Sequence, residues 1–195
     1  IFTVSAIRGV GDRSLQWVIP LYLADALGKS SLDWGYHLAL LAAPGIITSP
    51  LLGALSDRVG RKPVLVSLMA IAVFMPVTIL LGGGGVGMTM SVVVFGIVQT
   101  SANSLTQAAA VDIVEGKGLE GTFIGLMWGS NTLFAAVSSV IIGLIVGVQG
   151  SWDVAFYFAS ALFFVGFLTT LVMPSTGRAS HNLVKAEHSA PITRR

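Results

Sequence analysis

The sequence contains no cysteine and few charged residues. Only 10% of its 195 residues are Asp, Glu, Lys or Arg, whereas a soluble domain usually carries about 25%. So few charges cannot cover the water-facing surface of a globular domain of this length. The lack of cysteine excludes disulfides, thiolate metal ligands and cysteine nucleophiles within these residues, but it does not identify a compartment.

Apolar residues take the place of the missing charges. The chain is 54% hydrophobic, with a mean hydropathy of +0.84, and its 23 glycines suit closely packed transmembrane helices. The net charge of +2 would weakly suggest a nucleic-acid partner for a soluble protein, but basic loops on one membrane face explain it more simply. We therefore expect an integral membrane protein that contacts the lipid bilayer and no nucleic acid.

Six apolar stretches are long enough to cross a membrane, which takes about 20 residues. Polar or glycine-rich turns separate them, and Pro174 ends the last one. A polar tail, residues 174–195, is expected to be cytoplasmic and mobile. The fold class predicted is all-α, a polytopic membrane protein with one six-helix transmembrane bundle. The predicted spans are about 2–27, 33–56, 63–81, 86–114, 122–148 and 152–173.

Basic residues indicate which ends of the helices face the cytoplasm. Six spans put both ends of the segment on one side, and that side carries most of the basic residues even when the tail is left out. The opposite turns contain only Lys29. By the positive-inside rule, both ends are expected in the cytoplasm of a cell-membrane protein. On the cytoplasmic side, the basic residues in the turns between spans are Arg58, Arg61, Lys62 and Lys117.

The turn between the second and third predicted spans carries the most specific pattern. Residues 53–62 read Gly-Ala-Leu-Ser-Asp-Arg-Val-Gly-Arg-Lys. A glycine at the first position lets two helices approach closely, the aspartate can face a helix N-terminus, and the second glycine turns the chain sharply. A generic basic loop would explain the arginines but not this spacing. The positions that define the pattern are Gly53, Asp57, Arg58, Gly60, Arg61 and Lys62.

This segment resembles the signature loop of the major facilitator superfamily, Gly-x-x-x-Asp-Arg-x-Gly-Arg-Lys/Arg, at every defining position. Residues 21–28 and 150–157 also look like the outer ends of the first and sixth helices of a family half, so the resemblance covers about residues 1–173. Family members have twelve helices in two halves. The fourth predicted span lacks the arginine usual in the N-terminal half, so the resemblance implies the C-terminal half, with the N-terminal half as its missing partner.

The resemblance also implies a charge cluster at one end of the bundle. In the family, the acid and an arginine of the loop meet an acid of the fourth helix, and the cluster helps to latch the outward-open state. Asp57, Arg61 and Asp112 should form it here, with Arg58 as the alternative donor. The opposing interpretation is that these charges are separately solvated, each pair contributing under about 1 kcal/mol.

Polar residues inside the first predicted span form a candidate path for a solute or a proton. Arg8, Asp12 and Gln16 lie at i, i+4 and i+8 and share one helix face, with Arg13 on the next face. Charges at this depth are costly in lipid and should face protein or a watery cavity. A self-neutralising Arg8–Asp12 pair near the cytoplasmic end remains an equal alternative.

Amide side chains extend this candidate path to two other predicted helices. Gln99, Asn103 and Gln107 form a stripe on the fourth span, and Asn131 lies midway along the fifth. Such amides can bind a solute or join helices by hydrogen bonds. Three on one stripe exceed what one helix contact needs, so we favour the lining of a cavity for a small-molecule substrate.

Two glycine pairs in the fifth predicted span have the spacing of a close helix contact. Gly125 and Gly129, and Gly143 and Gly147, are expected to pack against other helices of the same half rather than against a second chain. No nucleophile motif or phosphate loop is present, and the three histidines are interpreted as solvated. We therefore expect no enzyme activity, no cofactor and no metal.

The function expected is secondary active transport by alternating access, with this chain supplying one half of the transporter. A scaffold or receptor on the same fold is the alternative, and a membrane enzyme is a weaker one.

Overall fold

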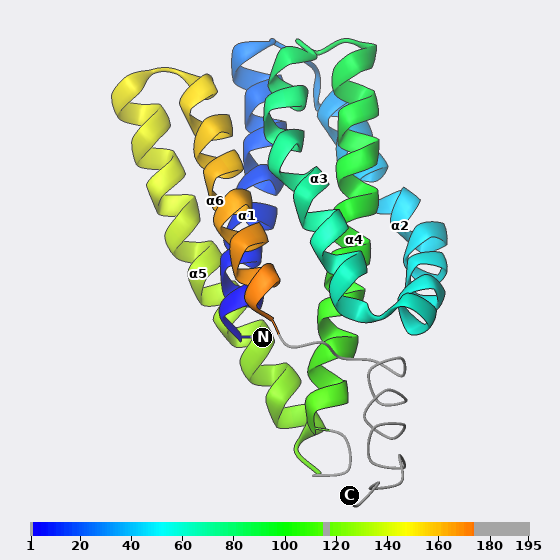
Figure 1. The fold of residues 1–195 in the computed structure, drawn as a ribbon. Coiled ribbons are helices and arrows are strands. Elements are labelled where there is room, and N and C mark those ends of the chain that lie inside the picture. Colours follow the sequence, from blue (N-terminus) through cyan, green and yellow to red (C-terminus); the bar gives the residue numbers. More distant parts are fainter. Residues whose placement is uncertain (1, 115–117, 174–195) are drawn as a thin grey trace, which may run out of the picture.

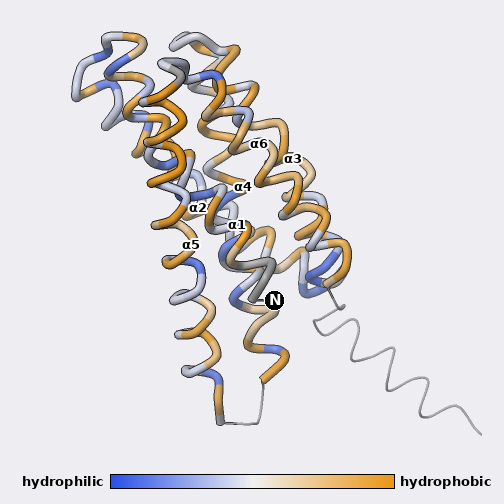
Figure 2. The backbone as a smooth tube through the Cα atoms, turned by 90° about the vertical axis from the view of Figure 1, so that its left-hand side faces the viewer, coloured by the Kyte–Doolittle hydropathy of each residue, from blue (hydrophilic) through white to orange (hydrophobic). Residues whose placement is uncertain are grey.

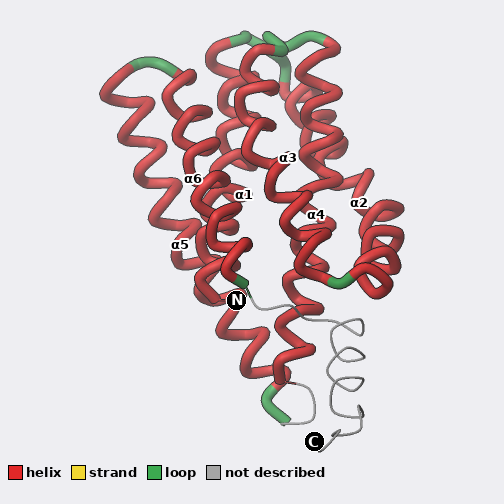
Figure 3. Tube along the Cα trace, in the orientation of Figure 1, coloured by secondary structure: helices red, strands yellow, loops and turns green. Residues whose placement is uncertain are grey.

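The computed structural model describes residues 2–114 and 118–173, which form a bundle of six long helices (Figure 1). Only helices and short turns occur in these ranges (Figure 3). The predicted all-α, six-helix fold is therefore confirmed, whereas the tail from residue 174 onward lies outside the described residues. The elements are α1 (Phe2–Leu21), a π-helical turn η1 (Tyr22–Ala26), α2 (Ser31–Val59), α3 (Arg61–Leu81), α4 (Val86–Val114), α5 (Glu120–Gln149) and α6 (Trp152–Val172).

Local sequence signals explain where α2 begins and ends. The Ser30 hydroxyl accepts from the backbone N–H of Asp33, and the Asp33 carboxylate accepts in return from the backbone N–H of Ser30, which is a capping box. At the other end Gly60 alone separates α2 from α3. Its φ of 106° is a conformation that favours glycine, as the predicted sharp turn requires.

Five of the described helices, α2 to α6, are long and apolar enough to cross a membrane. Hydrophobic residues colour most of their length in Figure 2. The 20-residue α1 differs because it contains Arg8, Asp12 and Arg13. It packs mainly against α5 and α6, so protein covers part of its polar surface. That α1 also crosses the membrane stays a prediction.

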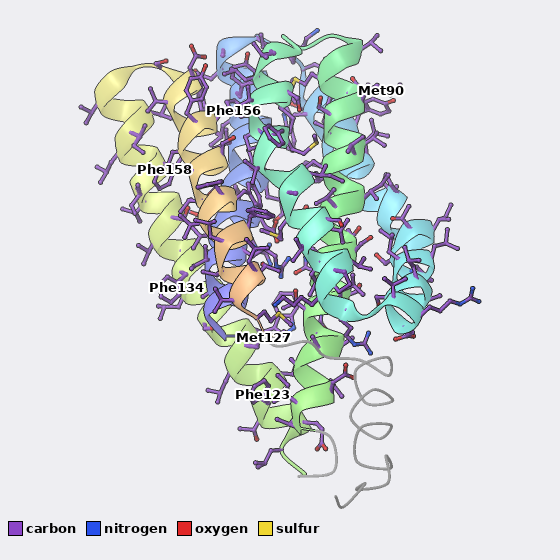
Figure 4. All side chains as sticks on the ribbon, in the orientation of Figure 1. Met90, Phe123, Met127, Phe134, Phe156 and Phe158 are labelled. Atoms are coloured by element: carbon purple, nitrogen blue, oxygen red, sulfur yellow. The ribbon has the colours of Figure 1, made fainter. Side chains whose placement is uncertain are left out.

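The core lies where five helix pairs pack together: α2 with α4, α3 with α4, α3 with α6, α1 with α5, and α1 with α6. Phe95 of α4 and Phe163 of α6 are fully buried there, with ring centroids 5.7 Å apart in an edge-to-face contact. Apolar side chains also cover the outside: Phe134 of α5, labelled in Figure 4, is 48% exposed. A surface of this kind suits a lipid surrounding.

A close crossing of α2 and α4 fixes the position of α4. A Cβ added at Gly96 would lie 2.3 Å from the backbone oxygen of Leu41, and one added at Gly45 would lie 2.3 Å from the Thr100 hydroxyl. Only hydrogen fits at these two points. The two helices are therefore in direct contact at both glycines, at Gly96 with the backbone of α2 and at Gly45 with a side chain of α4.

The glycines of α5 do not behave as predicted. A Cβ added at any of the four would meet nothing within 4 Å, so the expected close packing within this half is wrong. The same holds for Gly53, whose predicted role in a close helix approach has no counterpart in the described residues. No other described helix comes within packing distance of these glycines, and Gly143 and Gly147 line a cavity between α1 and α5. The four glycines are Gly125, Gly129, Gly143 and Gly147.

Candidate solute cavity and charge cluster

A cavity of about 670 Å³ lies between α1, α2 and α4. Its polar lining consists of Gln16, Gln99, Thr100 and Asn103, and apolar side chains with two tryptophans, Trp17 and Trp34, make up the rest. No charged residue lines it. A mostly apolar cavity of this size with a few polar groups is typical of a site for a small molecule.

The structure brings together some of the predicted polar residues and separates others. Gln16 of α1 and Gln99 and Asn103 of α4 meet at the cavity, whereas Gln107 and Asn131 do not line it. Asn131 is instead buried in α5 and lies over Gly9 of α1, where an added Cβ would be 2.0 Å from its Nδ2 atom. The sequence pattern did not point to Trp34 or Thr100 as cavity residues, because neither belongs to a polar stripe.

Arg8 and Asp12 form a buried ion pair behind this cavity. The Arg8 Nη1 atom lies 2.7 Å from Asp12 Oδ2, and the two side chains are only 3% and 7% exposed. Arg8 Nη2 also donates to Asn103 Oδ1 at 2.7 Å, which links α1 to α4. Neither charged residue lines the cavity. The pair therefore joins helices and touches the candidate solute site only through Asn103.

Arg13 lies on a different side of α1. It is exposed, and its Nη1 atom donates to Gln16 Oε1 at 2.9 Å. Gln16 in turn lines the cavity, so the arginine reaches the site through an amide, as Arg8 does.

The signature-loop charges gather at the end of the bundle where α2 turns into α3 (Figure 1). Arg61 Nε donates to Asp112 Oδ2 at 2.6 Å, and Arg61 Nη2 to Asp112 Oδ1 at 3.3 Å. Its Nη1 atom lies 3.3 Å from Asp57 Oδ1. Arg61 is therefore the donor between the two acids. Arg58 is exposed, and the structure shows no ion pair for it among the described residues, while Lys62 is half-buried.

One histidine differs from its sequence interpretation. His37 is only 7% exposed, with Nδ1 2.8 Å from the Asp33 carbonyl oxygen and Nε2 3.3 Å from the Thr89 hydroxyl. The expectation that it is solvated is wrong, because α4 covers the ring from the side of Thr89. The described residues contain no group of three or more His, Asp or Glu side chains that could hold a metal.

The sequence matches the family model of the Major Facilitator Superfamily over residues 1–194. The tetracycline resistance protein class H of Pasteurella multocida is 36% identical over 67 residues, which cover 33% of this chain and 17% of that protein. The class E protein of Escherichia coli is 46% identical over 50 residues, or 25% of this chain and 12% of that protein.

A solved structure has a similar fold. The inward-open conformation of a xylose transporter from Escherichia coli superposes with a TM-score of 0.68, over 90% of this chain and 48% of that one. The sequence identity is 14%, so this likeness shows the fold alone. Each match covers less than half of the known protein's length.

Proposed function

Since this chain belongs to the Major Facilitator Superfamily, we propose that it forms one half of a transporter that moves a small solute across the cell membrane. The observation that carries the proposal is the cavity of about 670 Å³ between α1, α2 and α4. It combines three amide side chains with an apolar, tryptophan-containing wall inside a bundle of apolar helices. That lining suits reversible binding of a small solute, because it offers hydrogen bonds without a fixed charge.

The complete transporter needs a second half opposite this cavity. Residues of α1, the following turn η1, α2 and α4 bound the cavity, and we infer that the remaining wall comes from outside this bundle. We assign that wall to the N-terminal half, with the present residues as the C-terminal half. Rocking of the two halves around the solute would open the site to each side in turn, which is alternating access in a secondary active transporter.

The Asp57–Arg61–Asp112 cluster has a different task in this proposal. None of its residues lines the cavity, so it cannot contact the solute there. Its three side chains tie the α2–α3 turn to α4 instead. We assign it to biasing the transporter toward one open state, at the cytoplasmic end to which the basic residues point.

Two other functions make different predictions. A receptor or scaffold on this fold would bind its ligand without moving it across the membrane. A membrane enzyme would convert the ligand, for which the cavity lining supplies no acid, no base and no charged group. The family and the uncharged lining both favour a transporter.

The proposal is tested by flux through the complete protein in liposomes. Tetracycline and xylose are the first probes, because the similar proteins carry those names. We expect saturable flux of one tested solute, and we expect Gln99→Leu to weaken its apparent affinity about tenfold, as expected when a hydrogen-bonding group is lost from a site.

The matched control is Ser67→Ala, which removes an exposed hydroxyl that donates to the Pro63 carbonyl oxygen on α3, a helix that does not line the cavity. It should leave affinity unchanged. Specific binding without any flux would instead support the receptor, and chemical conversion of the probe would support the enzyme.

A further inference from the structure

The contact between Arg8 and Asn103 fixes the direction of an amide at the cavity. A guanidinium group has five N–H donors and no acceptor, so only the carbonyl oxygen of an amide can face it. Arg8 Nη2 lies 2.7 Å from Asn103 Oδ1. This hydrogen bond orients the oxygen of Asn103 toward Arg8. The amino group of Asn103 is then available to bind a solute.

The buried pair leaves Arg8 little freedom to move. Its Nη1 atom is held by Asp12 at 2.7 Å, and its Nε atom is buried without a hydrogen-bond partner. A buried guanidinium with one unmet donor cannot easily rotate away, because it would lose further hydrogen bonds in a place that water does not reach. The buried Arg8–Asp12 pair, which lies behind the cavity, therefore fixes the orientation of Asn103.

A second amide of the lining also meets an arginine, here through an exposed contact. Arg13 Nη1 donates to Gln16 Oε1 at 2.9 Å, so the oxygen of Gln16 also faces an arginine. Thr100 donates its hydroxyl to the Gly96 carbonyl oxygen within α4. The lining contains no carboxylate. Two of its three amides therefore offer N–H donors to a solute, beside the apolar surface of Trp17 and Trp34.

We propose that Arg8 is a positioning residue that holds the amino group of Asn103 toward the cavity, and that the solute is consequently an uncharged molecule with an aromatic or apolar body and hydrogen-bond acceptors. Carbonyl, nitro, ether and ring oxygens meet this requirement. Organic cations that carry only hydrogen-bond donors do not meet it, because the N–H groups of Asn103 and Gln16 would face the N–H groups of the solute. This inference rests on the proposed function, in which the cavity is the solute site.

The test compares two aromatic probes on the complete protein: para-nitrophenyl glucoside, which is uncharged and rich in acceptors, and ethidium, which is a cation with N–H donors. The dissociation constant of each probe is measured by saturable binding to the purified protein in detergent. The ratio of the two constants gives the preference. The wild type should prefer the glucoside at least tenfold, as sites built around a hydrogen bond do.

Two variants separate positioning from structure. Asn103→Asp keeps the size and the bond to Arg8 but replaces the amino group by an oxygen, so it should reverse the preference in favour of ethidium. Arg8→Gln combined with Asp12→Asn keeps the pair uncharged overall, but glutamine can donate or accept and no longer fixes Asn103. That double variant should bring the ratio down about tenfold toward equal binding of the two probes. Ser67→Ala, on a helix that does not line the cavity, should keep the wild-type ratio.

The outcomes distinguish this inference from the function on which it rests. A wild-type ratio retained by both variants, with their thermal unfolding midpoints near the wild type, would overturn the role of Arg8 while leaving transport intact. A wild-type preference for ethidium would overturn the solute class. If the complete protein bound neither probe and moved no solute in liposomes, the proposed function would fail and this inference with it.

Discussion

Two arginines of this chain are built into similar triads in different surroundings. In each, the arginine pairs with an aspartate four residues away in the sequence and also bonds to a side chain of α4. The buried triad lies behind the cavity, and the loop triad lies at the α2–α3 turn. The triads are Arg8–Asp12–Asn103 and Arg61–Asp57–Asp112.

The two triads differ in burial and in charge. The buried triad is closed with an uncharged amide, so its charges sum to zero where the ion-pair side chains are 3% and 7% exposed. The loop triad is closed with a second carboxylate, and Asp57 is 48% exposed. The comparison shows how burial limits net charge. In the interior an unpaired charge would be costly, so the buried triad is neutral, whereas water near the turn can hydrate the extra carboxylate of the loop triad.

The largest effect should follow from breaking the buried pair. Arg8→Gln alone, or Asp12→Asn alone, leaves one buried charge without its partner and should cost about 3–5 kcal/mol in the free energy of unfolding. The double variant leaves no charge and should cost less than the sum of the two. Reversible unfolding in detergent measures all three, and additive single effects would show that the pair is not coupled.

A smaller effect is expected from moving the helix that both triads share. Gly96→Ala places a methyl group 2.3 Å from the backbone oxygen of Leu41, so α4 must shift away from α2. Overpacking of this kind costs about 1–3 kcal/mol. Gly35→Ala is the control on α2, where an added Cβ meets nothing within 4 Å. Equal effects of the two variants in a thermal melt would refute the close crossing.

The smallest change in stability is expected at the loop triad. Asp112 meets Arg61 through two contacts, whereas Asp57 meets it through one and is half exposed. We expect Asp112→Asn to cost about 1 kcal/mol and Asp57→Asn less, with the second effect lost at high salt. Unfolding at two salt concentrations decides this, and a larger effect at Asp57 would reverse our order.

The same two variants sharpen the functional side of the comparison. Because the loop triad does not line the cavity, both should slow turnover of the complete transporter while leaving solute affinity nearly unchanged. A large loss of affinity with normal turnover would mean that the triad belongs to the solute site.

Local sequence features predicted the helices, and the resemblance to a known signature loop predicted one of the triads. Long apolar runs located all six helices, and Gly60 marked the turn between α2 and α3. Arg61 and Asp112 lie near helix ends, where the order of the helices already places them at the same end of the bundle. Resemblance to a known loop supplied the pairing itself.

Contacts between helices account for what the sequence could not predict. The bond from Arg8 to Asn103 depends on how α1 rotates against α4, which the periodicity of either helix alone leaves undetermined. Asn131 and His37 are buried for the same reason, by neighbours from other helices. The α5 glycines were predicted to pack closely but do not, because their spacing leads to a close contact only where another helix lies directly against it.

The central claim, that a solute occupies the cavity between α1, α2 and α4, is tested most directly by thiol labelling. The 195 residues contain no cysteine, so Ala42→Cys introduces a single thiol into an exposed position of the cavity lining. The reference is Lys29→Cys, in an exposed turn outside the cavity. In the complete protein, with other cysteines replaced, a transported solute at about ten times its Kd should slow maleimide labelling of the cavity thiol about tenfold, because only the free fraction reacts. The reference thiol should react at an unchanged rate, and equal labelling of the cavity thiol with and without solute would contradict the account.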